Sequence, residues 1–133
     1  MNIKDIMTKK IITVDKNETV RTACDKYRDF KVGCLVVTYK DNVVGMLTER
    51  DVIERTICKD KNPNSTKIFE VMTENVKTID SYDSIEKALE LIKNHKIKKL
   101  PVVTNNKLVG IITITDIAYT RPSIRNFLEI SKK

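Results

Sequence analysis

The spacing of apolar residues predicts an amphipathic helix in each half of the chain. In residues 83–95 (DSIEKALELIKNH) apolar side chains recur at i, i+3, i+4 and i+7, at Ile85, Ala88, Leu89 and Ile92. This period is typical of a helix with one buried face. Either Ser84 or Asp83 is suited to cap its N-terminus. Residues 18–30 (ETVRTACDKYRDF) occupy the corresponding place in the first half and are predicted to be helical too.

Short apolar runs predict the strands. They lie at 11–15, 34–39 and 43–48 in the first half of the chain, and at 76–80, 99–104 and 107–112 in the second. The turns within the strand pairs contain Asp and Asn, which tolerate left-handed backbone and suit hairpins. A further helix is predicted after each pair, at about 50–59 and 114–120. The fold class is therefore α/β (α+β), with a β-α-β-β-α unit used twice.

The chain repeats itself with a constant offset. Gly45 and Asp51 of the heptad GMLTERD return as Gly110 and Asp116 of GIITITD, both 65 residues later. Without a gap across residues 6–53, twelve positions are identical to the residue at that offset. Composition alone would produce about three such identities. The sequence is a tandem duplication, and any account of function has to include it.

The repeat predicts the domain organisation. We expect one domain at 1–60, a polar linker at 61–66, a second domain at 67–121 and a tail at 122–133. The segments NIKDIMT and KIFEVMT are predicted to be short helical lead-ins that place Met7 and Met72 against the core. A terminal helix at 123–130 would either cover the end of a sheet or contact a second copy of the chain.

Composition limits the class of protein. At 133 residues the chain is about one domain long, so the repeats are expected to share one core. No apolar run approaches the roughly 18 residues that span a bilayer, and we expect neither a membrane partner nor a signal peptide. Three cysteines without a CxxC pair argue against disulfides and a zinc site, and fit a reducing, cytoplasmic location. They are Cys24, Cys34 and Cys58, and the first two are interpreted as core residues.

The net charge of +7 favours a polyanionic partner, whether nucleotide, nucleic acid or membrane surface. Lysines are spread along most of the chain, which is also typical of a solvated surface. They are densest in KNHKIKK, residues 93–99, so a basic nucleic-acid-binding module is an alternative function. Against it, aromatic residues are 5% of the chain with no Trp, and no helix-turn-helix or zinc-finger spacing occurs.

Each heptad has a Thr and an Asp where a strand is predicted to turn into a helix. The N–H groups at such a turn attract phosphate, and the carboxylates of Asp51 and Asp116 can accept the hydroxyls of a ribose. The structural interpretation is a helix cap with an acidic dipole partner. Because the heptad occurs twice at one offset, the sequence favours ligand binding over a cap alone. Gly45 and Gly110 would permit the close approach of a backbone or ligand, or a bulge.

The sequence resembles a tandem pair of CBS domains, a Bateman module, over about residues 5–120. The resemblance rests on IMTKKIITVD, GCLVV and GMLTERDV in the first half, and on VMTENVKTID, IKKLPVV and GIITITDI in the second. It implies two repeats packed with pseudo-two-fold symmetry, and an adenine nucleotide or related adenosyl compound bound in clefts between them. It also implies a stand-alone regulatory module that forms a flat homodimer and signals to an effector protein of unknown identity.

By this resemblance the ligand would meet the opening of the first strand, the entrance to the second strand, and the heptad of each repeat. The expected residues are Thr13, Val14, Gly33, Cys34, Leu35, Thr48, Arg50 and Asp51 in the first repeat, and Thr78, Ile79, Lys98, Lys99, Pro101, Thr113, Thr115 and Asp116 in the second. Cations in both sets favour AMP, ADP or ATP over the cationic S-adenosylmethionine as regulatory ligand. An S-adenosylmethionine-type sensor is the alternative, since either Asp would serve its ribose equally well.

Enzymatic activity is not expected. His95 is the only histidine and lies at the end of a predicted helix. The chain has no Ser/His/Asp or Cys/His grouping, no metal-ligand spacing, and neither GxxxxGK[ST] nor GxGxxG. No catalytic residue, metal or required cofactor is therefore predicted.

Overall fold

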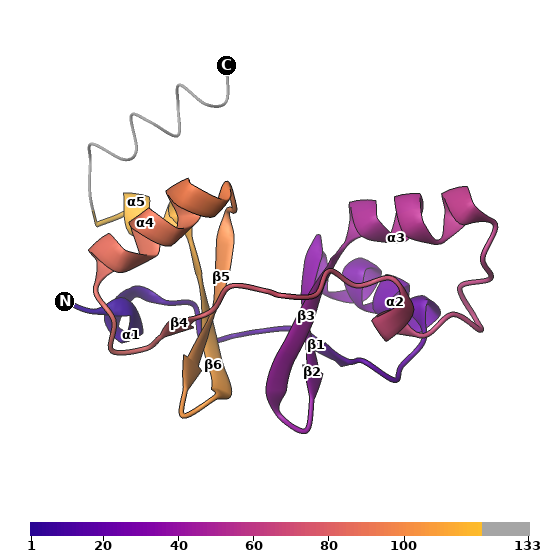
Figure 1. Cartoon of the computed structure of the whole chain (residues 1–133), viewed down its shortest axis with the longest axis horizontal. Helices are drawn as coiled ribbons and strands as arrows, with labels where there is room; N and C mark the ends of the chain where they lie inside the picture. Colours follow the sequence, from indigo (N-terminus) through magenta and orange to yellow (C-terminus); the bar gives the residue numbers. More distant parts are fainter. Residues whose placement is uncertain (121–133) are drawn as a thin grey trace, which may run out of the picture. The chain divides into compact units, whose positions relative to one another are not determined.

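Two compact units make up the part of the chain, residues 1–120, that the computed structural model describes (Figure 1). The central unit is Ile12–Val76, and the composite unit joins Met1–Ile11 to the residues from Lys77 on. Each contains a three-stranded sheet and helices in the order β-α-β-β-α. The predicted mixed fold class and the two repeats are confirmed. The predicted helix at 123–130 lies outside the described residues.

The central unit has its helices on one face of its sheet (Figure 1). The strands are β1 (Thr13–Asp15), β2 (Cys34–Tyr39) and β3 (Asn42–Thr48), with β1 parallel and β3 antiparallel to β2. The helices are α2 (Val20–Phe30) and α3 (Glu49–Arg55), with single 3-10 turns η1 (Ile57–Lys59) and η2 (Ile68–Glu70). The core between sheet and helices consists of Val14, Val20, Ala23, Leu35, Val37, Leu47, Val52, Ile68 and Val71.

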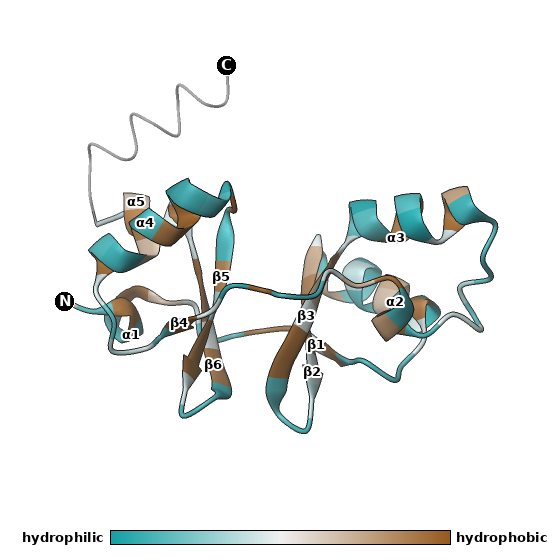
Figure 2. Ribbon diagram, in the orientation of Figure 1, coloured by the Kyte–Doolittle hydropathy of each residue, from teal (hydrophilic) through white to brown (hydrophobic). Residues whose placement is uncertain are grey.

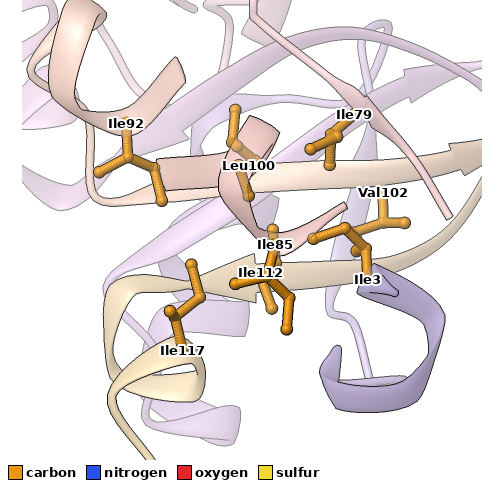
Figure 3. Close-up of a cluster of buried hydrophobic side chains, with 9 residues drawn as sticks. Ile3, Ile79, Ile85, Ile92, Leu100, Val102, Ile112 and Ile117 are labelled. Atoms are coloured by element: carbon orange, nitrogen blue, oxygen red, sulfur yellow. The ribbon is translucent and has the colours of Figure 1, made fainter. Parts of the chain in front are cut away.

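The composite unit repeats this arrangement with β4 (Ile79–Asp80), β5 (Lys99–Thr104) and β6 (Lys107–Thr113). Its helices are α1 (Ile3–Ile6), α4 (Ile85–His95) and α5 (Ile114–Ala118). Figure 3 shows Ile3 of α1 among core side chains from α4, β5 and β6. Hydrophobic residues follow the strands of both units, and hydrophilic residues occupy the hairpin turns (Figure 2).

The predicted element boundaries are correct for β2 and β5 and shift by a few residues elsewhere. The long helices begin at Val20 and Ile85, two residues later than predicted, because Thr19 and Ser84 are their N-caps. The Ser84 hydroxyl accepts the N–H of Lys87 at 3.1 Å, which settles the choice of cap. The first strands of the repeats are shorter than predicted, since β1 and β4 pair with their neighbours only over Thr13–Asp15 and Ile79–Asp80.

Both hairpins have a two-residue turn. This was predicted at Asn105-Asn106, whereas the turn predicted over Lys40-Asp41-Asn42 is one residue shorter because Asn42 begins β3. The φ angles are 50° and 68° at Lys40 and Asp41, and 50° and 66° at Asn105 and Asn106. Two consecutive left-handed residues form the turn whose twist matches that of antiparallel strands. Both sheets also have a register shift at the same repeat position, between Val37 and Thr38 and between Val102 and Val103.

The segment predicted as a linker, 61–66, is docked on the start of α2. The carbonyl of Thr66 accepts the N–H of Val20 at 2.9 Å, and that of Pro63 accepts the N–H of Arg21 at 3.0 Å. These bonds satisfy two of the four N–H groups that a helix start leaves without a partner. The linker is thus part of the central unit rather than a free spacer.

The lead-in segments pack on the repeat that they do not precede. Thr8, before the first repeat, exchanges two backbone hydrogen bonds with Ile111 of β6, both at 2.9 Å. Thr73, before the second repeat, exchanges two with Met46 of β3, at 2.9 and 3.0 Å. Met7 and Met72 pack against the cores as predicted. Each of these cores belongs to the other repeat, so the compact units cross the repeat boundaries.

The two heptad glycines permit this docking. A β-carbon on Gly45 would lie 2.6 Å from the sulfur of Met72 and 2.9 Å from the carbonyl oxygen of Thr73. On Gly110 it would lie 2.5 Å from the sulfur of Met7. Any side chain here would collide with the lead-in. The glycines are therefore required by the close approach of a backbone, one of the alternatives that the sequence left open.

We predict that Gly45→Ala lowers the free energy of unfolding by about 1–3 kcal/mol, the usual cost of overpacking a close contact. Gly33→Ala is the matched control, because its new methyl group would meet only the flexible end of Glu49, at 3.1 Å. Urea denaturation of both variants measures the difference. Equal midpoints for the two variants would contradict the packing explanation.

Candidate functional site

In the central unit three of the predicted binding segments meet at one end of the sheet. β2 begins at Cys34, which lies opposite Thr48 at the end of β3. The carbonyl of Gly33 accepts the N–H of Glu49 at 3.1 Å, so the entrance to β2 contacts the start of α3. Thr13 opens β1 on the other side of β2. The predicted residues of this repeat therefore share one sheet end.

The composite unit brings its segments together in the same way. Lys99 begins β5 opposite Thr113, the last residue of β6. The carbonyl of Lys98 accepts the N–H of Ile114 at 3.2 Å. Ile79 opens β4 beside β5. The duplication has thus preserved the relation between strand entrance and heptad.

Both heptads form a capping box with the same geometry. Thr48 Oγ1 accepts the N–H of Asp51 at 3.1 Å, and Asp51 Oδ2 accepts the N–H of Thr48 at 3.0 Å. The corresponding distances for Thr113 and Asp116 are also 3.1 and 3.0 Å. The capping interpretation is confirmed. The cap uses one carboxylate oxygen of each Asp, so the other oxygen, Oδ1, is outside it.

The surroundings of these second oxygens differ between the units. Asp51 Oδ1 lies 3.3 Å from a guanidinium nitrogen of Arg55. Arg55 also donates to the carbonyl of Val71 at 2.9 Å and to Thr73 Oγ1 at 3.0 Å. In the composite unit the hydroxyl of Thr8 lies 3.4 Å from both oxygens of Asp116.

The predicted residues fall into three groups by exposure. Four are buried: Val14, Leu35, Ile79 and Pro101. Six are half-buried: Thr13, Cys34, Thr48, Asp51, Thr113 and Asp116. Six are exposed: Gly33, Arg50, Thr78, Lys98, Lys99 and Thr115.

Arg50, the predicted cation of the first repeat, lies on the surface of α3. Its side chain is 84% exposed and pairs with Glu54 at 2.7 Å. The hydrogen bond and charge of Glu54 raise the pKa of Arg50, and the guanidinium in turn holds the pKa of the Glu54 carboxyl below its usual range. Because exposed ion pairs contribute little to stability, Arg50 can turn toward an anion at small cost.

Two further basic residues lie at the sheet end of the central unit, and sequence reasoning missed both. Lys26 of α2 donates to the carbonyl of Thr13 at 2.6 Å, and Arg55 contacts Asp51. The i, i+4 spacing of Asp51 and Arg55 on a predicted helix was a usable signal for the pair. No sequence signal pointed to Lys26, since its contact joins a helix to a strand that lies elsewhere in the sequence.

Tyr27 fastens α2 to the strand that ends in the heptad. Its hydroxyl donates to the carbonyl of Leu47 at 2.6 Å. Burial, with smaller contributions from Cys34 and Cys24, raises the pKa of Tyr27 above its ordinary value of 10.0. Burial likewise raises the pKa of the Cys24 thiol, which fits a packing role for this cysteine.

Each unit also has a cavity at the other end of its sheet, and none of the predicted binding residues lines either one. In the central unit the cavity measures about 530 Å³ and is lined by Lys16, Asn17, Val44, Phe69, Met72, Glu74 and Asn75. In the composite unit it measures about 240 Å³ and is lined by Lys4, Met7, Ser81, Tyr82, Thr104 and Val109.

Within residues 1–120 no group of three or more His, Cys, Asp or Glu could hold a metal ion. No helix in this part of the chain is long and apolar enough to cross a membrane.

Comparison with known proteins identifies the repeat. The family model for the CBS domain matches twice, at residues 3–57 and 68–122. The CBS domain-containing protein YhcV of Bacillus subtilis is 34% identical over 122 residues, which are 92% of this chain and 86% of the relative. Hypoxic response protein 1 of Mycobacterium tuberculosis is 30% identical over 120 residues, 90% of this chain and 84% of the relative.

Solved structures agree with these matches. The crystal structure of Hypoxic Response Protein I, with two coordinated zinc ions, superimposes with a TM-score of 0.81 at 29% identity and covers 90% of this chain and 98% of that one. A CBS-domain protein of Burkholderia ambifaria that is assigned to signal transduction gives a TM-score of 0.78 at 26% identity, covering 92% and 95%.

We predict that Tyr27→Phe lowers the free energy of unfolding by about 1 kcal/mol at pH 7, through the lost hydrogen bond. Because the pKa of Tyr27 is raised in the folded state, its hydroxyl stays protonated there while the unfolded chain ionises near its ordinary value of 10.0. The contribution of the Tyr27 hydroxyl to the free energy of unfolding is complete below pH 10.0 and is lost as the pH rises toward the folded pKa.

Urea denaturation of wild type and Tyr27→Phe between pH 7 and 10.5 tests this, and the two free energies should converge at the high end. Tyr82→Phe is the control, since that ring is 63% exposed. A difference between wild type and Tyr27→Phe that does not change with pH would contradict the assignment.

Proposed function

The chain belongs to the CBS-domain family and is a CBS pair of the regulatory kind, and we propose that it binds an adenine nucleotide, AMP, ADP or ATP. The observation that supports this most is the shared geometry of the two sheet ends. In each unit an aspartate has one oxygen in a helix cap and a second outside it, next to the entrance of the middle strand. Bound nucleotide would regulate a partner protein, and the chain itself would catalyse no reaction.

The chemistry of these residues suits a phosphorylated nucleoside. The Oδ1 atoms of Asp51 and Asp116 are acceptors for ribose hydroxyls. Exposed cations are near both heptads, Arg50 in the central unit and Lys98 and Lys99 in the composite unit. These cations favour a phosphate over the sulfonium of S-adenosylmethionine, which is the alternative ligand.

We also propose that the chain acts as a homodimer, as is implied for CBS pairs. Ile53 of α3 and Ile57 of η1 are 55% and 56% exposed and lie four residues apart in the sequence. A second copy of the chain could cover both. Ligand binding would alter the partner's activity only by its different affinity for two states of this assembly.

A basic nucleic-acid-binding module is the second candidate. The observation in its favour is that Lys93, Lys96, Lys98 and Lys99 are all exposed within one short segment. Such binding would weaken steeply with salt, because phosphate contacts release counterions. Saturable, stoichiometric binding of a small nucleotide would not weaken steeply with salt.

We predict that the double variant Asp51→Asn, Asp116→Asn binds AMP about 10–100-fold more weakly than wild type, the usual worth of hydrogen bonds to a charged group. Asparagine keeps an acceptor for the capping N–H, so the fold should survive. Isothermal titration with AMP, ADP, ATP and S-adenosylmethionine measures the change. Asp60→Asn is the charge-matched control, on an exposed residue with left-handed backbone that asparagine tolerates.

Unchanged affinity in the double variant would overturn the ribose assignment. If wild type binds none of the four ligands, the sensor function is wrong. Salt-dependent binding of an oligonucleotide in the same preparation would then favour the basic module.

A further inference from the structure

The two heptad aspartates have the same cap but different neighbours one helical turn later. Residue 55 in the central unit is Arg, and the residue 65 positions on is Thr120. Arg55 contacts Asp51 Oδ1 at 3.3 Å and donates to Val71 and Thr73 of the lead-in at 2.9 and 3.0 Å. One guanidinium thus joins the heptad carboxylate to the lead-in segment.

Among the described residues of the composite unit, this clamp has no counterpart. The hydroxyl of Thr120 donates to the carbonyl of Ile117 at 2.8 Å and does not reach the carboxylate. Beyond its cap, Asp116 contacts the hydroxyl of Thr8 at 3.4 Å, which is long for a bond between oxygen atoms. Among residues 1–120 no cation forms an ion pair with Asp116.

The difference decides which carboxylate can accept a ribose. A hydroxyl that approaches Asp51 Oδ1 competes with the guanidinium of Arg55, an opposite charge 3.3 Å from that oxygen. Asp51 is also only 15% exposed behind Arg55. At Asp116 the competitor is a neutral threonine hydroxyl, which can rotate and donate elsewhere.

We propose that the two heptads are not equivalent: Asp116 binds the ribose of the adenosyl ligand tightly, whereas Arg55 holds Asp51 as a structural cap that binds ribose weakly. This inference rests on the proposed function and names the carboxylate that performs it. The chain then has one tight site for an adenosyl ligand, and Arg55 sets the difference between its two repeats.

Adenosine is the probe that isolates this effect, because it has the ribose but no phosphate to attract Arg50 or Arg55. Titration of wild type with adenosine, followed by AMP, should give one tight site per chain. Asp116→Asn should weaken that site about 10-fold or more, and Asp51→Asn less than about 3-fold.

A reciprocal pair of variants tests the role of the clamp. Arg55→Thr copies the composite unit and should create a second adenosine site within about 10-fold of the first. Thr120→Arg copies the central unit and should weaken the tight site by about the same factor. Thermal unfolding checks each variant, and Thr120→Arg provides the test if the loss of Arg55 unfolds the central unit.

The outcomes separate the two proposals. If wild type binds neither adenosine nor AMP, the proposed function fails and this inference fails with it. If wild type binds, but Asp51→Asn and Asp116→Asn weaken binding equally, or Thr120→Arg leaves it unchanged, only the inequality of the heptads is wrong. If adenosine binding is lost in Asp51→Asn and kept in Asp116→Asn, the assignment of the tight site to Asp116 is wrong.

Discussion

The close approach of a lead-in segment to a heptad glycine is the contact on which each unit depends. Thr73 can exchange backbone hydrogen bonds with Met46 only because Gly45 has no side chain in the space that Met72 occupies. The same contact recurs at Gly110. It brings a segment from before one repeat into the core of the other, so neither repeat completes its own fold. The chain has two cores, one in each unit, so the expectation from its length that the repeats share one core is wrong.

This constraint also positions the chemistry. The glycine lies three residues before the heptad threonine, so the strand that the lead-in covers is the strand that ends in the capping box. Capping and ligand binding were alternatives at the level of sequence, but they use different atoms. The cap takes Oδ2 of Asp51 or Asp116 and orients the carboxylate. A residue can therefore hold the start of a helix and present a fixed acceptor at the same time.

Sequence reasoning could predict what is local and repeated. The hairpins follow from short apolar runs with Asp or Asn between them, and β2 and β5 have the predicted bounds. It could not predict which core each lead-in joins. Met7 and Met72 are identical and each faces an identical glycine, so pairing within a repeat and pairing across repeats satisfy the same pattern. Only the three-dimensional path of the chain distinguishes the two.

The residues that were missed have a common cause. Aligning the repeats directs attention to the positions that match, whereas Lys26 and Arg55 stand opposite Leu91 and Thr120. These differences do not disturb the capping boxes, because Lys26 and Arg55 are not part of them. The capping distances are the same in both units. A duplicated fold is free to change charge at positions that touch the heptad without forming it. Differences in ligand binding between the two repeats are therefore expected at those mismatched positions, since the matched residues form the same cap in both units.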